Sequence, residues 1–236
     1  MITPYCLILA GGQGTRIQPV IGRTPKCLAP VGETTFLALQ MRALRAAGIS
    51  RIFLSLGAYA GDVVAWLDAN PEFADVGTIV ETSPLGTGGA VAFAFQQLGA
   101  PTLLVTNGDT LIEANLAAML APLASSNGEL ARMGVVHRSD RLRYGGVVTD
   151  ASSRVTGFTE KGSRTPGLVN SGMYLLSRDC FQGETVSQFS LEQHTLPLLS
   201  SNRALFACPL QGDFTDIGVP EDYFAFCAKH AIRKSS

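Results

Sequence analysis

The first half of the chain alternates short apolar runs with longer helical patterns, and this alternation constrains the fold most. The runs YCLILA, RIFLSL, GTIVE and TLLVTNGD are apolar at consecutive positions rather than at every second one. Between them stand segments with helical spacing, TFLALQMRALRAAG, DVVAWLDAN and TGGAVAFAFQQLG. Continuous apolar strands that are separated by helices are typical of parallel strands covered on both faces. The first half therefore predicts a wound α/β sheet.

From about Arg132 the pattern changes to closely spaced strand-like runs, RMGVVHR, YGGVVT, RVTGFTE and GLVNSGMYLL. A helix near Ser190 to Leu199 follows, and a last helix is expected to start at Pro220. No Gly/Ser linker, low-complexity tract or repeat separates the two parts. We therefore expect one domain over residues 1–236, in which a mixed, mostly parallel sheet extends from a first part (about 1–130) into a second (about 131–236).

Residues at the expected helix ends support these assignments. Gly48 and Gly99 follow helical stretches, where a left-handed residue commonly ends a helix. Asp62 is expected to cap the helix that follows it.

Composition limits the classes of partner. Charged residues make up 16% of the chain and the formal net charge is −1, so neither nucleic acid nor a membrane is expected as a partner. No leader pattern is visible, and no apolar run approaches the ~20 residues that cross a bilayer, so we expect a cytoplasmic protein. The five cysteines are odd in number and scattered, which argues against a disulfide framework or a structural zinc site.

A glycine-rich loop follows the first strand, with glycine at positions 11, 12 and 14 and a cation at Arg16. In wound sheets ligands bind beyond the carboxyl ends of the strands, and bare backbone amides there suit phosphate oxygens. Ile17 stands where the dinucleotide-binding fingerprint requires its third glycine, and the chain has no Gly-Lys-Ser/Thr of a P-loop. On this fragment alone, a tight connection with no ligand remains an equal alternative.

The longer run GGQGTRIQPVIGRTPKCLAPVG adds Lys26 within Thr24-Pro25-Lys26. It closely resembles the signature of the sugar-1-phosphate nucleotidylyltransferases. The resemblance extends over nearly the whole chain, through PLGTGGA, VTNGD, RYGGV, FTEKG, GLVNSGMYLL and FTDIGVPEDY. It implies a Rossmann-like nucleotide-diphospho-sugar transferase fold, with the nucleotide bound by the first part and the sugar by the second.

Within that family, NGDT, FTEKG, GLVNSG and DIGVPEDY are most similar to the D-glycero-α-D-manno-heptose 1-phosphate guanylyltransferases. This implies transfer of GMP from GTP to the heptose 1-phosphate, for bacterial surface polysaccharide. Mannose 1-phosphate guanylyltransferase and the uridylyl- or thymidylyltransferases remain alternatives, as does a non-enzymatic nucleotide-sugar sensor. The sequence leaves open a homodimer.

The implied reaction brings two anions together, so positioning and charge neutralisation must carry the catalysis. By resemblance, Arg16 and Lys26 face the triphosphate, while Asp109 and Asp216 hold Mg²⁺ against it. Each aspartate ends a short strand, where a carboxylate on its own is more often a turn former or a helix cap. The sugar phosphate is already ionised, which agrees with the absence of a histidine-based catalytic constellation.

The resemblance also assigns binding residues. Glu81 could accept hydrogen bonds from guanine, although an acidic residue here also occurs in relatives that use other bases. Glu160 and Lys161 would take sugar hydroxyls and the sugar phosphate, which requires a bulge or a strand end because neighbours on a strand point to opposite faces. The predicted nucleotide-binding residues are Leu9, Ala10, Gly11, Gly12, Gly14, Thr15, Glu81, Gly86, Thr87, Gly88, Asn107 and Gly108. The predicted sugar-phosphate-binding residues are Tyr144, Gly145, Glu160, Lys161 and Asn170.

One segment departs from the family pattern. Relatives commonly carry Gly-(Lys/Arg)-Pro after the Pro-Lys motif, whereas this chain has Gly32-Glu33-Thr34-Thr35. Any contact that the family makes through that basic residue is in doubt here.

Overall fold

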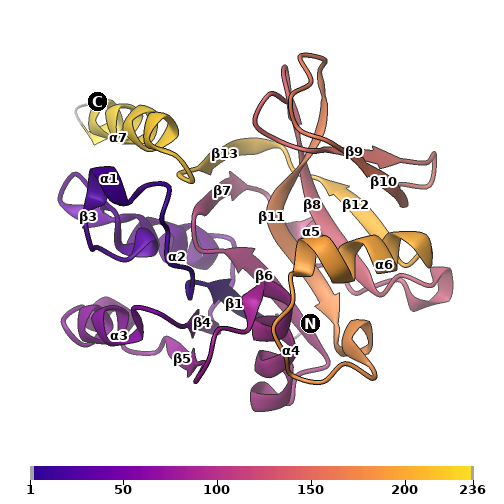
Figure 1. Cartoon of the computed structure of the whole chain (residues 1–236), viewed down its shortest axis with the longest axis horizontal. Helices are drawn as coiled ribbons and strands as arrows, with labels where there is room; N and C mark the ends of the chain where they lie inside the picture. Colours follow the sequence, from indigo (N-terminus) through magenta and orange to yellow (C-terminus); the bar gives the residue numbers. More distant parts are fainter. Residues whose placement is uncertain (1–2, 235–236) are drawn as a thin grey trace.

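A nine-stranded mixed sheet runs through the computed structural model, which describes residues 3–234. Along the sheet the strand order is β10-β9-β11-β6-β1-β4-β5, while β8 pairs with β11 and β12 pairs with β8 (Figure 1). The strands are β1 (Tyr5–Leu9), β4 (Ile52–Leu56), β5 (Gly77–Val80), β6 (Thr102–Asn107), β8 (Ala131–Arg138), β9 (Gly146–Thr149), β10 (Val155–Thr159), β11 (Gly167–Ser177) and β12 (Leu205–Pro209).

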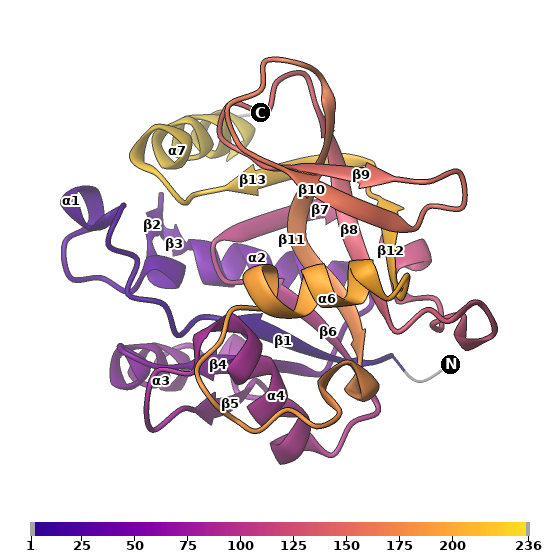
Figure 2. The ribbon, with the colours of Figure 1, turned by 45° about the vertical axis from the view of Figure 1, so that its right-hand side comes forward.

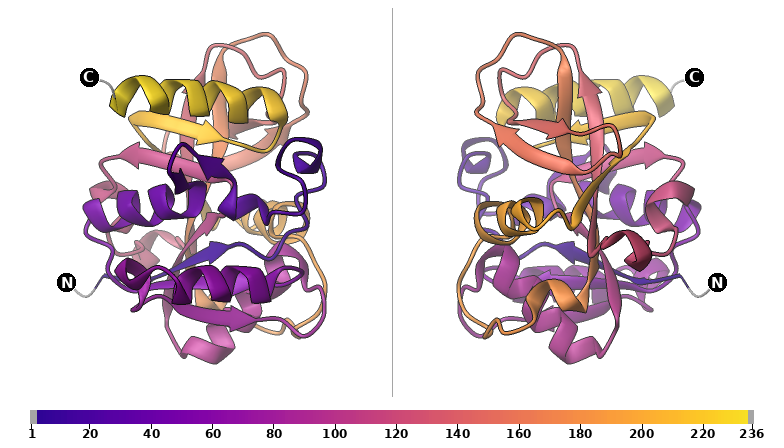
Figure 3. Two further views of the ribbon diagram at one scale, coloured as in Figure 1. Left: turned by 90° about the vertical axis from the view of Figure 1, so that its left-hand side faces the viewer. Right: turned by 90° about the vertical axis from the view of Figure 1, so that its right-hand side faces the viewer.

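The strands β5, β4, β1 and β6 are parallel to one another, as the continuous apolar runs predicted. Both faces of β1 are covered. Cys6 and Ile8 pack with α2 (Phe36–Ala46) and α3 (Ala60–Asp68), whereas Leu7 packs on the other face with α4 (Gly86–Leu98). Figure 3 shows α2 and α3 together on one side of the molecule. The carboxyl ends of β1 and β6 therefore lie at one edge of a sheet that is closed on both faces.

The second part adds antiparallel strands to the same sheet, because β11 pairs with β6 and with β8. The register of β11 shifts between Asn170 and Tyr174, where Gly172 has a φ of 72°. Asn170 is thus the last residue of β11 that pairs in register with β8 before the bulge. The predicted helix near Ser190 is present as a π-helical turn, η5 (Leu191–Thr195), followed by α6 (Leu196–Ser201). The turn η5 packs against α4, and α6 packs against β10. The mixed α/β fold expected from the sequence is confirmed.

A separate two-stranded sheet joins distant parts of the chain. Strand β13 (Gly212–Asp216) pairs antiparallel with β7 (Thr110–Ala114), with Asp216 opposite Thr110. The last helix, α7 (Pro220–Lys234), begins at Pro220 as predicted and lies beside β13 (Figure 2). This pairing places the end of β13 next to the turn that follows β6.

Shorter elements complete the chain. Gly48 and Gly99 adopt positive φ after α2 and α4, as predicted. The capping role of Asp62 is wrong, because α3 begins two residues earlier and Asp62 lies inside its first turn. Within residues 3–234, none of the helices is both long and apolar enough to span a bilayer. The remaining elements are α1 (Gln18–Ile21), η1 (Lys26–Leu28), β2 (Pro30–Val31), β3 (Thr34–Thr35), η2 (Pro71–Phe73), α5 (Ala117–Leu120), η3 (Ser125–Asn127) and η4 (Arg178–Phe181).

Candidate active site

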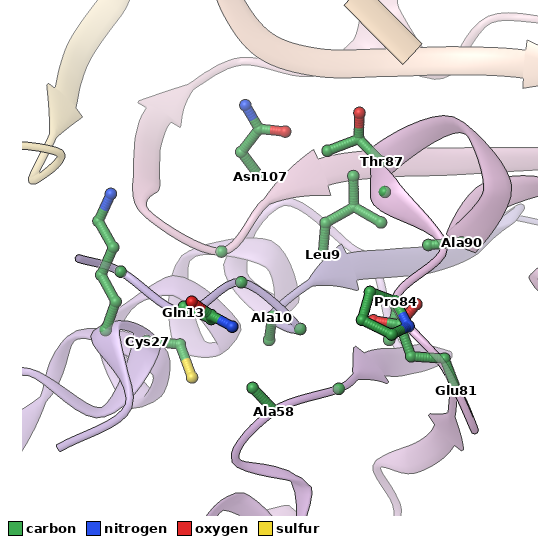
Figure 4. Close-up of a pocket in the computed structure, with 18 of the residues that line it drawn as sticks. Leu9, Ala10, Gln13, Cys27, Ala58, Glu81, Pro84, Thr87, Ala90 and Asn107 are labelled. Atoms are coloured by element: carbon green, nitrogen blue, oxygen red, sulfur yellow. The ribbon is translucent and has the colours of Figure 1, made fainter. Parts of the chain in front are cut away.

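A cavity of about 690 Å³ opens at the carboxyl ends of β1 and β6. The glycine-rich loop after β1, the turn after β6 and the start of α4 form its walls. In Figure 4, Glu81 and Pro84 lie together at one end of this cavity and Cys27 lies at the other. Asn107 and Thr87 face it from one side and Ala58 from the opposite side.

The loop after β1 lies close to Lys26. Gly14 has a φ of 63°, and a methyl group on it would lie 2.9 Å from Cβ of Lys26. Glycine is the residue that accepts both the conformation and the contact. Pro25 ends the segment before Lys26, which starts the short helix η1. Loop and lysine therefore line the same wall of the cavity, together with the exposed Arg16.

The turn between β6 and β7 carries Asp109 and lies against the end of β1. The amide of Gly108 donates to the carbonyl of Leu9 at 3.0 Å, and a methyl group on Gly108 would lie only 2.6 Å from that oxygen. The carbonyl of Asp109 accepts from the amide of Ile217 at 2.9 Å. Backbone contacts thus join the segments that carry Asp109 and Asp216.

Two carboxylates and one ammonium group meet at this junction. Lys26 forms an ion pair with Asp109, and Asp216 accepts a hydrogen bond from the amide of Gly218 at 2.6 Å. Burial and the charge of Asp109 raise the pKa of the Asp216 carboxyl, and the Gly218 amide and Lys26 offset only part of that rise. The junction therefore carries more negative charge than its single lysine compensates.

This donor set fits a magnesium ion. Within residues 3–234, no three His, Cys, Asp or Glu side chains gather in one group. Mg²⁺ is usually held by one or two carboxylates together with substrate phosphates and water, and Asp109 and Asp216 would supply the carboxylates beside the glycine-rich loop. A divalent cation would also relieve the repulsion that raises the pKa of Asp216.

Glu81 follows β5 at the far end of the cavity. Its Oε2 accepts from the amide of Leu85 at 2.8 Å, so the carboxylate caps the start of α4. Its Oε1 faces Gly11 and Gly57, where an added methyl group would lie 2.7 Å and 2.4 Å from that oxygen. Burial raises the pKa of Glu81, and the Leu85 amide offsets part of the rise. One oxygen is thus committed to the helix and the other lines the cavity.

The start of α4 is crossed by a strap, residues 187–191, from the second part of the chain. The carbonyl of Phe189 accepts from the amide of Gly88 at 3.0 Å, and a methyl group on Gly88 would lie 2.3 Å from the Phe189 ring. The Thr87 hydroxyl donates to Glu192 at 2.7 Å and accepts from the amide of Leu191 at 2.8 Å. The amide of Gly88, one of the residues predicted to bind the nucleotide, therefore holds the strap.

A second cavity, of about 340 Å³, adjoins the first and shares Arg16 and Gly218 with it. Arg143 and Lys161 add two further cations to its wall, beside Asp216. Arg143 is paired with Asp222 in the first turn of α7. The two cavities thus meet at the carboxylate–lysine junction.

Local structure explains the other walls of this second cavity. Asn170 lies at the bulge of β11, where its Oδ1 accepts from the amide of Gly172 at 2.9 Å and its Nδ2 donates to the Tyr174 hydroxyl at 2.7 Å. The Tyr144 ring packs edge-on against Phe214, with centroids 6.1 Å apart. Lys161 lies beyond the end of β10.

The structure brings together most of the residues singled out in the sequence. The first cavity is lined by the predicted Leu9, Ala10, Gly11, Gly12, Gly14, Thr15, Arg16, Lys26, Glu81, Gly86, Thr87, Asn107, Gly108 and Asp109. The second is lined by the predicted Arg16, Tyr144, Gly145, Lys161, Asn170 and Asp216. Gly88 lies behind the wall against Phe189, and Glu160 is exposed outside both cavity walls. The roles of all these residues stay predictions.

Several residues that line the cavities were not predicted from the sequence. Arg143 could have been predicted, because it stands beside Tyr144 in the RYGGV run. No sequence pattern indicates Gln188, because it belongs to the strap, which reaches the first cavity from a distant part of the chain.

The profile of the nucleotidyl transferase family matches residues 5–231, so the chain belongs to this family. The expectation of a nucleotidyltransferase is thereby confirmed.

Individual proteins are similar to this chain over most of its length. The chain is 32% identical over 218 residues to a D-glycero-α-D-manno-heptose 1-phosphate guanylyltransferase of Aneurinibacillus thermoaerophilus, covering 92% of this chain and 94% of the relative. It is 33% identical to mannose-1-phosphate guanylyltransferase 1 of Arabidopsis thaliana, over 92% of this chain but 62% of that protein. The crystal structure of HddC from Yersinia pseudotuberculosis complexed with GMP-PN superposes with a TM-score of 0.84 at 34% identity, covering 97% of this chain and 99% of HddC.

Proposed function

We propose that this protein transfers GMP from GTP to a sugar 1-phosphate, with D-glycero-α-D-manno-heptose 1-phosphate as the preferred acceptor. A phosphate oxygen of the sugar attacks the α-phosphorus of GTP, the bond from that phosphorus to the bridging oxygen breaks, and pyrophosphate leaves. The product, a GDP-heptose, would serve the synthesis of a bacterial surface polysaccharide such as a capsule, lipopolysaccharide or S-layer glycan. The observation that carries the proposal is the pair of adjoining cavities with the charged junction between them.

The two cavities suit the two substrates. The glycine-rich first cavity offers backbone amides and Lys26 to a triphosphate, and its far end offers Glu81 to a base. The second cavity offers Lys161, Arg143 and Arg16 to a sugar phosphate. Arg16 borders both, so it can hold the reacting phosphates against each other. No general base is needed, because the attacking oxygen is already ionised.

Asp109 and Asp216 would hold Mg²⁺ at the junction. When bound, the ion neutralises phosphate charge and orients the triphosphate. Lys26, held by Asp109, is placed to meet the negative charge that develops on the departing pyrophosphate.

The preference for guanine rests on Glu81 and on the names of the relatives. The N1–H and exocyclic amine of guanine are both donors, and a carboxylate presents only acceptors. The preference for heptose over mannose rests on the Aneurinibacillus heptose 1-phosphate guanylyltransferase, because it is matched over 94% of its length, whereas the Arabidopsis relative is matched over 62%. A nucleotide-sugar sensor is disfavoured because the metal-binding pair and both lysines are retained.

Pyrophosphate release tests the proposal across GTP, ATP, UTP and dTTP combined with heptose, mannose and glucose 1-phosphates. A site that pairs with one base rejects others by several powers of ten, so GTP should exceed UTP by at least about 100-fold in kcat/KM. Equal use of UTP or dTTP, or better use of mannose 1-phosphate than of the heptose, contradicts the substrate assignment.

Glu81→Gln sharpens the base assignment. The glutamine oxygen can still accept from Leu85, while its amino group would meet the guanine donors in place of Oε1. We expect kcat/KM with GTP to fall at least about tenfold and kcat/KM with UTP to change little. An equal fall with both triphosphates would show that Glu81 only caps α4.

A further inference from the structure

Gln40 lies in α2, behind the wall of the first cavity, and its side chain is only 2% exposed. Its Nε2 donates to the carbonyl of Asn107 at 2.8 Å and to the carbonyl of Thr110 at 2.6 Å. These two carbonyls flank Gly108 and Asp109. One side-chain amide therefore bridges the base of the turn that carries Asp109.

The orientation of this amide follows from its partners. Both neighbours are carbonyl acceptors, so the amino group must face them, and the reverse orientation would bring three oxygens together. The Oε1 of Gln40 is then buried without a hydrogen-bond partner among the described residues. Leaving a buried acceptor unpaired costs free energy, and the two hydrogen bonds from Nε2 offset that cost. An apolar side chain of the same length would remove both of these bonds from the turn.

The bridged turn is also held from within and by two other elements. The Thr110 hydroxyl donates to the Asn107 carbonyl at 3.2 Å. The amide of Gly108 bonds to Leu9 at the end of β1, and the carbonyl of Asp109 bonds to Ile217 after β13. None of these contacts ties the Asn107 and Thr110 carbonyls to a helix. Gln40 adds that anchor from α2, a helix with five other buried residues.

We propose that Gln40 is a positioning residue that holds Asp109 in place through the backbone of its turn. It touches neither cavity, so it acts on the reaction only through Asp109 and the Lys26 that Asp109 binds. Its effect on turnover rests on the proposed function. Its effect on the geometry of the turn does not.

Gln40→Met tests the inference, because methionine matches the length of glutamine and has no amide. We expect a folded variant in which kcat falls about tenfold or more, because small misplacements of catalytic groups are costly. The Mg²⁺ concentration for half-maximal activity should rise, and the KM for the sugar 1-phosphate should stay within about twofold. Amide hydrogen exchange at residues 108–110 should be faster than in the wild type.

Ser200→Ala is the matched control. The Ser200 hydroxyl is also buried and donates to a backbone carbonyl, that of Val155 at 2.9 Å, far along the chain from the junction. This variant should lose stability while kcat, the Mg²⁺ dependence and exchange at residues 108–110 stay as in the wild type. The contrast separates positioning from the general loss of a buried hydrogen bond.

Gln40→Asn provides a second variant, because its amide is one methylene too short to reach both carbonyls. It should show the same shift in Mg²⁺ dependence and the same faster exchange. Wild-type kcat and exchange in either folded variant would overturn the inference, and loss of the fold in both would assign Gln40 a structural role instead. If the wild type transfers no nucleotide with any substrate pair, the proposed function fails, while faster exchange at residues 108–110 still supports Gln40 as the restraint on the turn.

Discussion

The two cavities differ in the kind of group that forms them. The first is lined largely by small residues and backbone at the ends of parallel strands, including Gly11, Gly12 and Gly108. The second is lined mainly by long polar and charged side chains, Arg143, Tyr144, Lys161 and Asn170 among them, that come from loops and a bulge of antiparallel strands. A wall of backbone can change its ligand only if the fold changes, whereas a wall of side chains can change with single substitutions. We infer that the first cavity holds the part of the reaction common to the family and that the second sets the acceptor.

The junction between the cavities should respond most strongly to substitution. Asp109→Asn and Asp216→Asn should each lower kcat by about 100-fold or more, because each leaves the metal ion with one fewer anionic ligand. Steady-state kinetics with saturating Mg²⁺ measures the effect. Asp213→Asn, on the same strand as Asp216 but paired with Lys229 at the surface, is the control and should keep near-normal turnover. Normal turnover in a folded Asp109 or Asp216 variant would remove the metal assignment.

The backbone that lines the first cavity should not accommodate even a single added methyl group without loss of stability. Gly108→Ala brings a methyl group 2.6 Å from the Leu9 carbonyl, and relief requires a shift of backbone. Overpacking of this kind costs about 1–3 kcal/mol, so the melting temperature should fall by about 2–10 °C.

Gly12→Ala is the control for Gly108→Ala in a thermal-unfolding experiment. A methyl group on Gly12 meets no atom within 4 Å, so the melting temperature should stay within about 1 °C of the wild type. Equal melting temperatures for the two variants would show that the wall is more adaptable than its contacts indicate.

The smallest expected effect concerns the stability of the free enzyme. Because burial and Asp109 raise the pKa of Asp216 on folding, its contribution to stability is present at low pH and is lost as the pH rises through the pKa in the fold. Asparagine is neutral at every pH and can still accept from Gly218. In Mg²⁺-free buffer at pH 7, Asp216→Asn should therefore melt at a higher temperature than the wild type.

The difference should shrink as the pH falls through the raised pKa of Asp216, because the wild-type carboxyl then becomes protonated as well. Differential scanning calorimetry at several pH values would follow it. A lower melting temperature for Asp216→Asn at pH 7 would mean that Lys26 and the Gly218 amide stabilise the charged carboxylate more than burial destabilises it.

The first cavity was more predictable from sequence than the second. Strand β1, its glycine-rich loop and Asp109 follow from apolar runs and from the rule that ligands bind at the carboxyl ends of parallel strands. The strap was not predictable, because Phe189 meets Gly88 only after α4 and η5 have packed together. Local patterns describe neighbours in the chain, whereas the strap depends on contacts about 100 residues apart.

The second cavity illustrates the same limit. The resemblance assigned both Glu160 and Lys161 to the sugar site, yet only Lys161 lines the cavity. Which of two adjacent residues faces inward depends on where β10 ends and how the following loop turns. The pair Arg143–Asp222 likewise depends on α7 lying beside the loop before β9, which no local pattern indicates.

Substitution of the two lysines tests most directly whether the first cavity binds the nucleotide and the second binds the sugar phosphate. Lys26 lines only the first cavity and Lys161 only the second. With both substrates varied, Lys26→Ala should chiefly impair use of GTP, and Lys161→Ala should raise the KM for the sugar 1-phosphate about tenfold with little change in the KM for GTP. The reverse pattern, or an equal effect of each variant on both substrates, would contradict the assignment of nucleotide to the first cavity and sugar phosphate to the second.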